Sequence, residues 1–442
     1  MSTVSSGAAG PPPAEQAAGF RHQRLNSLLN YTRYTDPAVL VVWVFVTTFD
    51  LNFITPLRYA AAGYFAAMAL LLGRQTAPVI VRSWPLFIIP LLCTLSSLWA
   101  LDPGDAVRKG IALAMTGLIA IYISTRMSGR QILVAYFSVE ILVALISTAV
   151  GAKDPGGAWI GIYTQKNFFA IQMFILYATS IGIMLDRGQI PWLRMLALLM
   201  SGFAAFLILM AKSSTTTLLI AIMTVMILGQ AFFWGPAGKI RHARSFFGFI
   251  IVIIGLIVSL FLFGILQIDL KEQVQVALGK DSTMSGRTYL WEIARRLIDE
   301  HPWTGLGANS FWRAELGPAN SIAQYFLYDK FQGFSFHNSY YENGVSFGYP
   351  GFYATIFVAG WAVFNSARTW LRNQTVLNAI FFMIAAAVVI RTNSEADLAG
   401  EFGGTVVLLF VAATRREIFG KPATQKGLPG STHPSSPRTV SA

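Results

Sequence analysis

Charged side chains are scarce in this sequence of 442 residues: 12% of its residues are charged, whereas 54% are hydrophobic. Soluble domains carry roughly 25% charged residues, so the composition excludes an ordinary soluble enzyme. The single cysteine, Cys93, lies in an apolar run, which excludes a disulfide framework and a cysteine-based metal site. No HExxH motif or DxD-type acidic cluster occurs, and Asp102 and Asp105 alone are weak evidence for a metal site. We therefore expect no bound metal.

A signal peptide is also missing. Residues 1–19 are rich in Ala, Gly, Pro and Ser, without a basic segment that leads into an apolar core. We expect residues 1–36 to form a disordered cytoplasmic N-terminus and residues 416–442 a disordered cytoplasmic tail. The net charge of +12 would suggest nucleic acid in a soluble protein. Because Lys and Arg gather in the cytoplasmic loops of membrane proteins, we expect no nucleic-acid partner here.

Apolar runs of about 18–22 residues recur along the chain, and each is long enough to cross the roughly 30 Å hydrocarbon core of a bilayer. They predict an all-α polytopic membrane protein with about twelve transmembrane helices. The run at 191–233 is too long for one span, so it predicts two helices with a tight hairpin near Lys212–Ser214. The predicted spans are 37–54, 57–73, 83–100, 106–125, 131–150, 163–185, 191–211, 214–233, 246–268, 347–366, 374–391 and 399–415.

Loop charges orient these spans. One set of connections carries clustered Arg and Lys, which the positive-inside rule places in the cytoplasm. The alternate connections are acidic or mixed and include the long segment 269–346, so we expect that segment to be a periplasmic loop. Spans one to nine then occupy residues 37–268 and the last three occupy 347–415, with both termini cytoplasmic.

Several basic side chains are predicted at the outer ends of helices, where the positive-inside rule disfavours them. A charge at membrane depth costs about 2.5–3.5 kcal/mol, so it usually has a partner or a function. Any one of them taken alone is as well explained by a cation that reaches the lipid interface. Their coincidence at one face favours a site for an anionic headgroup, best a phosphate or pyrophosphate. The residues assigned to this site are Arg108, Lys109, Lys166, Asn167, Lys212, Arg391 and Glu395.

The long loop contains one amphipathic helix. Ser285 is its predicted N-cap, and Pro302 with Gly305 and Gly307 predicts a turn after its end. Arg287 then lies in the first turn, where a cation opposes the helix dipole; a bound anion would explain it, and an ordinary exposed arginine is the alternative. The apolar residues at helical spacing are Leu290, Ile293, Ala294, Leu297 and Ile298.

A second short helix, HNSYYENG, is predicted to begin at His337. Helical spacing places Tyr341 one turn after His337 and Glu342 one turn after Asn338. The positive end of a helix dipole favours a neutral imidazole, which can act as a general base. The alternative is a structural, hydrogen-bonded loop histidine.

Four stretches resemble the O-antigen ligase and O-antigen polymerase-like superfamily of bacterial membrane glycosyltransferases, over about residues 80–405. The last two are the most specific, while GIYTQKN and the late RTNSE most resemble the exopolysaccharide polymerase branch. The stretches are SSLWALDPGDAVRKG, GIYTQKN, SGRTYLWEIARRLIDEHPWTGLGANSF and FHNSYYENGVSFGYPG.

The resemblance implies a GT-C-like fold in the bacterial inner membrane and a glycosyltransferase that needs neither metal nor cofactor. The donor would be an oligosaccharide on polyprenyl (undecaprenyl) pyrophosphate, and the acceptor a sugar hydroxyl of another lipid-linked repeat unit at the periplasmic face. His337 would deprotonate or orient that hydroxyl, while Arg287 and Arg108 would hold the pyrophosphate. Attack opposite the leaving group would invert the anomeric centre. Membrane lipids, a chain-length regulator and export machinery are the other expected partners.

Three further residues are assigned to the site: Glu342 to its catalytic group, and Asn338 and Tyr341 to substrate binding. One departure from the family pattern concerns the tight hairpin, AKSSTTT. Ser214 stands where the family usually has a cation, and Lys212 lies two places earlier as a candidate substitute.

Two other functions compete with a polymerase for exopolysaccharide biosynthesis. An O-antigen ligase would use the same chemistry and transfer the glycan to lipid A–core. A flippase for lipid-linked oligosaccharide fits twelve spans, but its charges would be expected along a central cavity, and no inverted repeat is visible. A membrane sensor would need a cytoplasmic signalling domain, which the sequence lacks.

Overall fold

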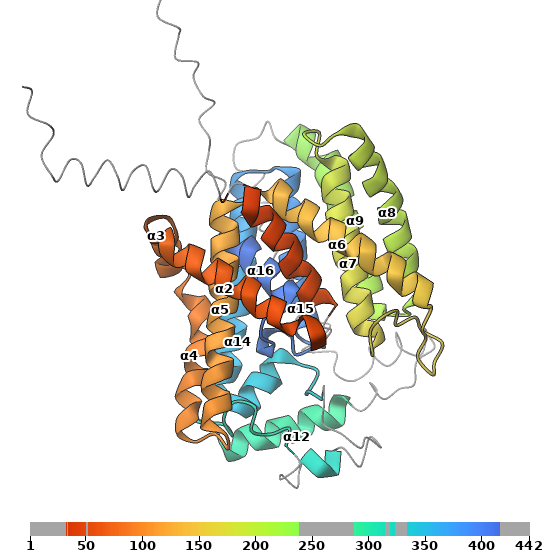
Figure 1. Ribbon diagram of the computed structural model, residues 1–442. Coiled ribbons are helices and arrows are strands. Elements are labelled where there is room, and N and C mark those ends of the chain that lie inside the picture. The colour runs from red at the N-terminus through yellow and green to blue at the C-terminus, as the bar shows by residue number, and fades with distance from the viewer. Residues whose placement is uncertain are drawn as a thin grey trace, which may run out of the picture.

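The protein is built from helices throughout the part that the computed structural model describes (Figure 1). That part contains no named strand. The described part excludes the predicted ninth span and the predicted N-cap Ser285. It also excludes both predicted disordered tails, apart from residues 32 and 34–36 next to the first span. The described residues are 32, 34–49, 52–237, 287–313, 319–322 and 334–415.

Helices occupy the predicted spans that fall on described residues. A helix at Tyr34–Thr48 comes first, and 3₁₀ turns η2 (Trp84–Phe87) and η3 (Ser96–Leu98) extend α4 at both ends. The others are α2 (Thr55–Leu71), α3 (Gly73–Arg82), α4 (Ile88–Leu95), α5 (Pro103–Arg126), α6 (Gly129–Val150), α7 (Lys166–Leu185), α8 (Pro191–Met210), α9 (Ser214–Ala237), α12 (Arg287–Glu300), α14 (Ser339–Arg372), α15 (Val376–Arg391) and α16 (Gly404–Thr414).

Within the described residues, five helices are long and apolar enough to cross a membrane, namely α5, α6, α7, α8 and α14. The pair α2 and α3, bent by 99°, raises this number to six if it forms one span. On α8, Leu198, Leu199 and Phe206 are exposed, as expected for side chains that contact lipid. The class of polytopic helical membrane protein is thus supported, while the total of twelve spans stays a prediction.

One local prediction was wrong and another was confirmed. Residues 74–82 were predicted as a connection, but they form α3, which buries Thr76 and Val79. HNSYYENG was predicted as a separate short helix, and it forms the first part of α14, which non-helical backbone at Gly348 separates from the part in the tenth predicted span. The helix is kinked at Gly348, whose φ of 68° favours glycine, and a Cβ there would lie 2.4 Å from the carbonyl oxygen of Pro302.

The core lies where α15 and α16 are surrounded by longer helices. Both are short, yet nearly every side chain of α16 is buried, and α15 buries most of its residues. They contact α5, α7 and α14, while α7, α8 and α9 stand together on one side of the bundle (Figure 1). The connection between α15 and α16, residues 392–403, is therefore held at the end of a buried helix pair. The candidate site forms around it.

Candidate active site

Helix α12 lies across this end of the bundle, at the bottom of Figure 1, and packs against α14. The predicted amphipathic pattern is confirmed, because all five predicted apolar residues are buried and share one cluster with Phe311, Phe336 and Val345. Arg287 is the first residue of the helix. The predicted turn is also present: Gly307, with a φ of 91°, packs so closely on Ala100 that a Cβ would lie 2.6 Å from its Cα.

His337 lies just outside α14. The prediction that it begins the helix was wrong, because Asn338 is the N-cap and its Oδ1 accepts hydrogen bonds from the N–H groups of Tyr340 and Tyr341. His337 has a left-handed backbone with a φ of 47°, which is uncommon for a residue with a side chain and often marks a functional position. Its Nδ1 lies 3.2 Å from Oε2 of Glu395.

Glu395 gathers side chains from separate parts of the chain. Its Oε1 accepts hydrogen bonds from Nδ2 of Asn167 at 2.9 Å and from Nη2 of Arg287 at 3.0 Å, while its Oε2 faces His337. The carboxylate side chain is only 6% exposed. Asn167, Arg287, His337 and Glu395, called the Glu395 cluster below, come from α7, α12, the segment before α14 and the α15–α16 connection. The structure therefore brings together four of the predicted site residues.

The backbone fixes the position of Glu395. Its N–H donates to the carbonyl of Arg391, and its carbonyl accepts a hydrogen bond from Oγ of Ser339 at 2.9 Å. Arg391 is buried and its Nη1 lies 2.7 Å from both carboxylate oxygens of Asp397. Arg391 therefore supports the turn that carries Glu395 and places a second positive charge beside it.

These neighbours decide the ionisation of Glu395. Burial raises the pKa of Glu395, but the hydrogen bond to His337 and the charges of Arg287 and Arg391 outweigh it and lower the pKa to about 2. Glu395 is therefore a negatively charged carboxylate at neutral pH, and it attracts the cations around it.

We expect this pKa shift to make the folded protein sensitive to acid. Since the pKa of Glu395 falls from 4.5 to about 2 on folding, its ionisation stabilises the fold by about 3 kcal/mol above pH 4.5. That contribution is lost as the pH falls through 4.5 toward 2. The measurement compares the unfolding free energies of the wild type and Glu395→Gln in detergent at neutral pH and at low pH. A difference between the two proteins that stays constant with pH would contradict the linkage.

A second cluster surrounds Arg108, which is 51% exposed. Its Nε donates to Asp105 at 2.9 Å and its Nη1 to Glu401 at 2.8 Å. Nζ of Lys109 donates to Oδ1 of Asn309 at 2.6 Å, and Asn309 in turn donates to Asp105. Glu401 lies in the same α15–α16 connection as Glu395. The predicted cations Arg108 and Lys109 therefore lie at a site that shares this connection, although they do not contact the Glu395 cluster.

The two predicted lysines of α7 and the hairpin lie to the side. Nζ of Lys166 is 3.8 Å from Asp154, and Nζ of Lys212 donates to the carbonyl of Gly156 at 3.1 Å. Both face the loop between α6 and α7 rather than Glu395. The hairpin contacts the Glu395 cluster through Ser213 instead of Lys212, because Oγ of Ser213 lies 3.4 Å from Oδ1 of Asn167.

The other three predicted site residues hold the loop together. Glu342 accepts hydrogen bonds from Nε1 of Trp312 at 3.0 Å and from the N–H of Phe336 at 2.8 Å. Asn338 caps α14, as described above. The hydroxyl of Tyr341 accepts a hydrogen bond from Arg295 at 3.3 Å. These contacts give all three a positioning role for the segment that carries His337.

Sequence reasoning missed several groups. Glu401, Asp105 and Asn309 organise the Arg108 cluster, and Ser339 holds the backbone of Glu395. Asp105, Asn309 and Ser339 lie in the stretches that carry the resemblance, but no role was assigned to them, because most of their partners are far away in the sequence. Among the described residues, no group of three or more His, Cys, Asp and Glu side chains lies close enough to hold a metal ion.

Known proteins share sequence similarity with this chain. Residues 195–356 match the family described as O-Antigen ligase, and this stretch includes α12, Arg287 and His337. The chain is therefore similar to the O-antigen ligase superfamily, as its motifs predicted. It is 24% identical over 342 residues to "Exopolysaccharide production protein ExoQ" of Rhizobium meliloti (strain 1021), an alignment that covers 74% of this chain and 75% of that protein. The predicted resemblance to the exopolysaccharide branch is thus confirmed.

Proposed function

We propose that the protein is a polysaccharide polymerase of exopolysaccharide biosynthesis. It transfers an oligosaccharide from polyprenyl pyrophosphate to a sugar hydroxyl of another lipid-linked repeat unit at the periplasmic face of the inner membrane. The observation that carries the proposal is the Glu395 cluster, which holds a histidine and an arginine on one carboxylate at the end of a membrane helix bundle. The relative named "Exopolysaccharide production protein ExoQ" supports the assignment to exopolysaccharide biosynthesis.

The histidine supplies the base. Because the Glu395 carboxylate faces Nδ1 of His337, it favours the tautomer that carries its proton on Nδ1. Nε2 then has a free lone pair, which accepts the proton of the attacking hydroxyl. Glu395 orients the ring and stabilises the positive charge that the imidazole gains during the reaction. The sugar oxygen forms the new glycosidic bond as the bond to the pyrophosphate oxygen breaks.

The arginine serves the leaving group. A guanidinium has five N–H donors, and Arg287 uses Nη2 to contact Glu395 while its side chain stays 15% exposed. The remaining donors are available to the pyrophosphate, whose negative charge grows as the glycosidic bond breaks. Arg108, half exposed in the neighbouring cluster, is the second candidate contact for the pyrophosphate.

We expect Arg287→Ala to lower the rate of transfer from the pyrophosphate-linked donor by about a hundredfold or more, as loss of one charge-stabilising donor does in other enzymes. Arg287→Lys should restore only part of the rate, because an ammonium cannot contact Glu395 and a phosphate in the same fork geometry. The measurement is the transfer rate at matched protein level. Arg296→Ala, which removes an exposed arginine of the same helix, is the control. An equal loss of rate and of protein abundance in Arg287→Ala would assign Arg287 a structural role.

The deciding experiment incubates the purified protein with a lipid-linked repeat unit in the presence of a metal chelator. A ladder of products is the result expected for a polymerase. The family description favours O-antigen ligase as the second candidate, and transfer only to added lipid A–core would establish that function instead. Unchanged substrate that moves across vesicles would indicate a flippase. Activity that returns only with added metal would contradict the metal-independent mechanism.

A further inference from the structure

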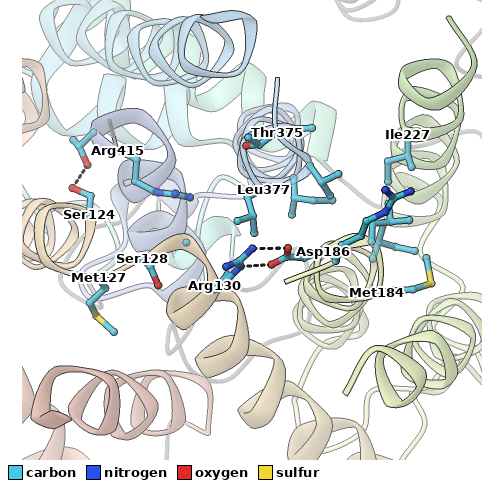
Figure 2. Close-up of a pocket in the computed structure, with 18 of the residues that line it drawn as sticks. Ser124, Met127, Ser128, Arg130, Met184, Asp186, Ile227, Thr375, Leu377 and Arg415 are labelled. Atoms are coloured by element: carbon cyan, nitrogen blue, oxygen red, sulfur yellow. Dashed lines mark hydrogen bonds and ion pairs between the residues drawn. The ribbon is translucent and has the colours of Figure 1, made fainter. Parts of the chain in front are cut away.

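A large cavity lies at the other end of the helices from the Glu395 cluster. Helix α7 begins beside that cluster and ends at Leu185, and its 20 residues extend about 30 Å. At the far end, a cavity of about 1730 Å³ opens between the ends of α5, α6, α7, α15 and α16 and the side of α9 (Figure 2). We call it the arginine cavity, because it is lined by Arg82, Arg126, Arg130, Arg187, Arg194 and Arg415.

The lining of the arginine cavity contains one carboxylate, and that carboxylate is already paired. Asp186 binds Arg130 through two contacts, Nε to Oδ2 at 2.5 Å and Nη2 to Oδ1 at 2.9 Å (Figure 2). The hydrogen bond from Arg130 lowers the pKa of Asp186, so its negative charge is present and balances one arginine. Five further arginines share the lining without a second acidic residue.

Two of these arginines use uncharged acceptors. Arg126 donates to Oε1 of Gln75 at 3.1 Å and to Oγ1 of Thr32 at 2.9 Å, and its buried Nε has no hydrogen-bond partner among the described residues. Nε of Arg194 donates to the carbonyl of Met184 at 2.9 Å. These bonds position the guanidinium groups at the cavity. The charge of Arg126 also interacts with the carboxylate of Asp36, and the charge of Arg194 with that of Asp186.

Apolar side chains line the rest of the arginine cavity. Figure 2 shows Met184, Ile227 and Leu377 around the Arg130–Asp186 pair, and these side chains come from α7, α9 and α15. A cavity that combines a cluster of arginines with apolar walls suits a molecule with an anionic head and a hydrocarbon part. A guanidinium binds phosphate through two parallel hydrogen bonds, which makes phosphate the best match among anionic groups.

We propose that the arginine cavity binds the phosphate of an anionic lipid headgroup. Basic pockets between transmembrane helices are suited to such headgroups, and this end of the bundle is the one that the positive-inside rule assigns to the cytoplasm. The chain's own terminal segments carry more basic than acidic residues. Residues 1–31 hold two arginines and one glutamate, and residues 416–442 hold four Lys and Arg and one glutamate.

Bound lipid would contact several helices at this end. Arg126 belongs to α5, Arg130 to α6 and Arg194 to α8, so a headgroup in the cavity lies among arginines of three separate helices. The proposal concerns binding and stability, and it stands independently of the polymerase reaction.

The test measures lipid retention by the purified, delipidated full-length protein with native mass spectrometry. Phosphatidylglycerol, phosphatidylcholine and inorganic phosphate at millimolar concentration are the three probes. We expect phosphatidylglycerol to bind about tenfold more tightly than phosphatidylcholine and to raise the melting temperature. The double variant Arg187→Gln/Arg194→Gln should lose about a hundredfold in affinity for phosphatidylglycerol, because each of the two lost charge-assisted contacts weakens binding by about tenfold.

The matched control is Arg368→Gln/Arg372→Gln, which removes two exposed arginines at the C-terminal end of α14 that do not line the cavity. It should bind phosphatidylglycerol like the wild type. Equal binding of both lipids, or an equal loss in the control variant, overturns the proposal. Inorganic phosphate that binds as tightly as phosphatidylglycerol would also overturn it, since the site would then take a free phosphate instead of a lipid. A polymerase assay on the same variants keeps this outcome separate from the proposed function.

Discussion

Replacement of His337 by alanine is expected to abolish long-chain polysaccharide while the protein stays folded and inserted in the membrane. The imidazole lies outside α14 and contacts the Glu395 carboxylate, so its loss removes the proposed base without opening the buried core. General-base catalysis contributes about a hundredfold to ten-thousandfold in rate, and we expect a decrease in that range. The measurement is the rate of glycan transfer from a lipid-linked repeat unit at matched protein level, together with the chain-length distribution in cells.

His301→Ala is the matched control for this variant. His301 is an exposed histidine that follows the end of α12, so its removal should leave the transfer rate within about twofold of the wild type, as for most surface substitutions away from a site. Normal chain length in His337→Ala would remove the histidine from the mechanism. A variant that no longer accumulates in the membrane would instead assign it a role in folding.

Glu395→Gln is expected to lower the transfer rate almost as far as His337→Ala. The amide keeps the size of the side chain, but it removes the negative charge that faces both His337 and Arg287. Breaking a buried ion pair by removing one partner typically destabilises a protein by about 3–5 kcal/mol, so a lower melting temperature should accompany the loss of rate. The turnover number should fall more than the apparent donor affinity, because Glu395 acts through its neighbours.

Two comparisons separate this positioning role from simple destabilisation. The double variant His337→Ala/Glu395→Gln should be about as slow as His337→Ala alone, because residues that act as a unit are not additive. Glu401→Gln removes a carboxylate of the same connection that pairs with Arg108 instead, and it should leave the coupling to His337 intact. Losses that simply add in the double variant would contradict a shared mechanism for His337 and Glu395.

Local patterns predicted the parts of the fold that depend on short stretches of sequence. The periodicity at Leu290 to Ile298 gave the buried face of α12, and the overlong run at 191–233 gave the hairpin between α8 and α9. Gln165 is the N-cap of α7, so Lys166 and Asn167 lie at the start of that helix, the end at which they were predicted. In each case the signal is a property of neighbouring residues, which the sequence shows directly.

Contacts between segments that are far apart in the sequence could not be predicted from local patterns. His337 and Glu395 are 58 residues apart, and Arg287 is 108 residues from Glu395. Both Glu395 and His337 were assigned to the site, but nothing in the sequence indicated that they pair. Helix α14 begins after His337, where the start was predicted, because Asn338 is its N-cap. The amide oxygen of Asn338 accepts hydrogen bonds from two backbone N–H groups. Lys212 was assigned to the phosphate on sequence position alone, and the structure turns it toward Gly156.

The late position of Glu395 in the chain has a consequence for biosynthesis. Asn167, Arg287 and His337 are all synthesised before the carboxylate that collects them. A chain that has emerged only as far as α14 therefore holds three parts of the site with no common partner. The site is complete only when α15 and α16 carry their connection into place, so the proposed transfer reaction would require a fully synthesised chain.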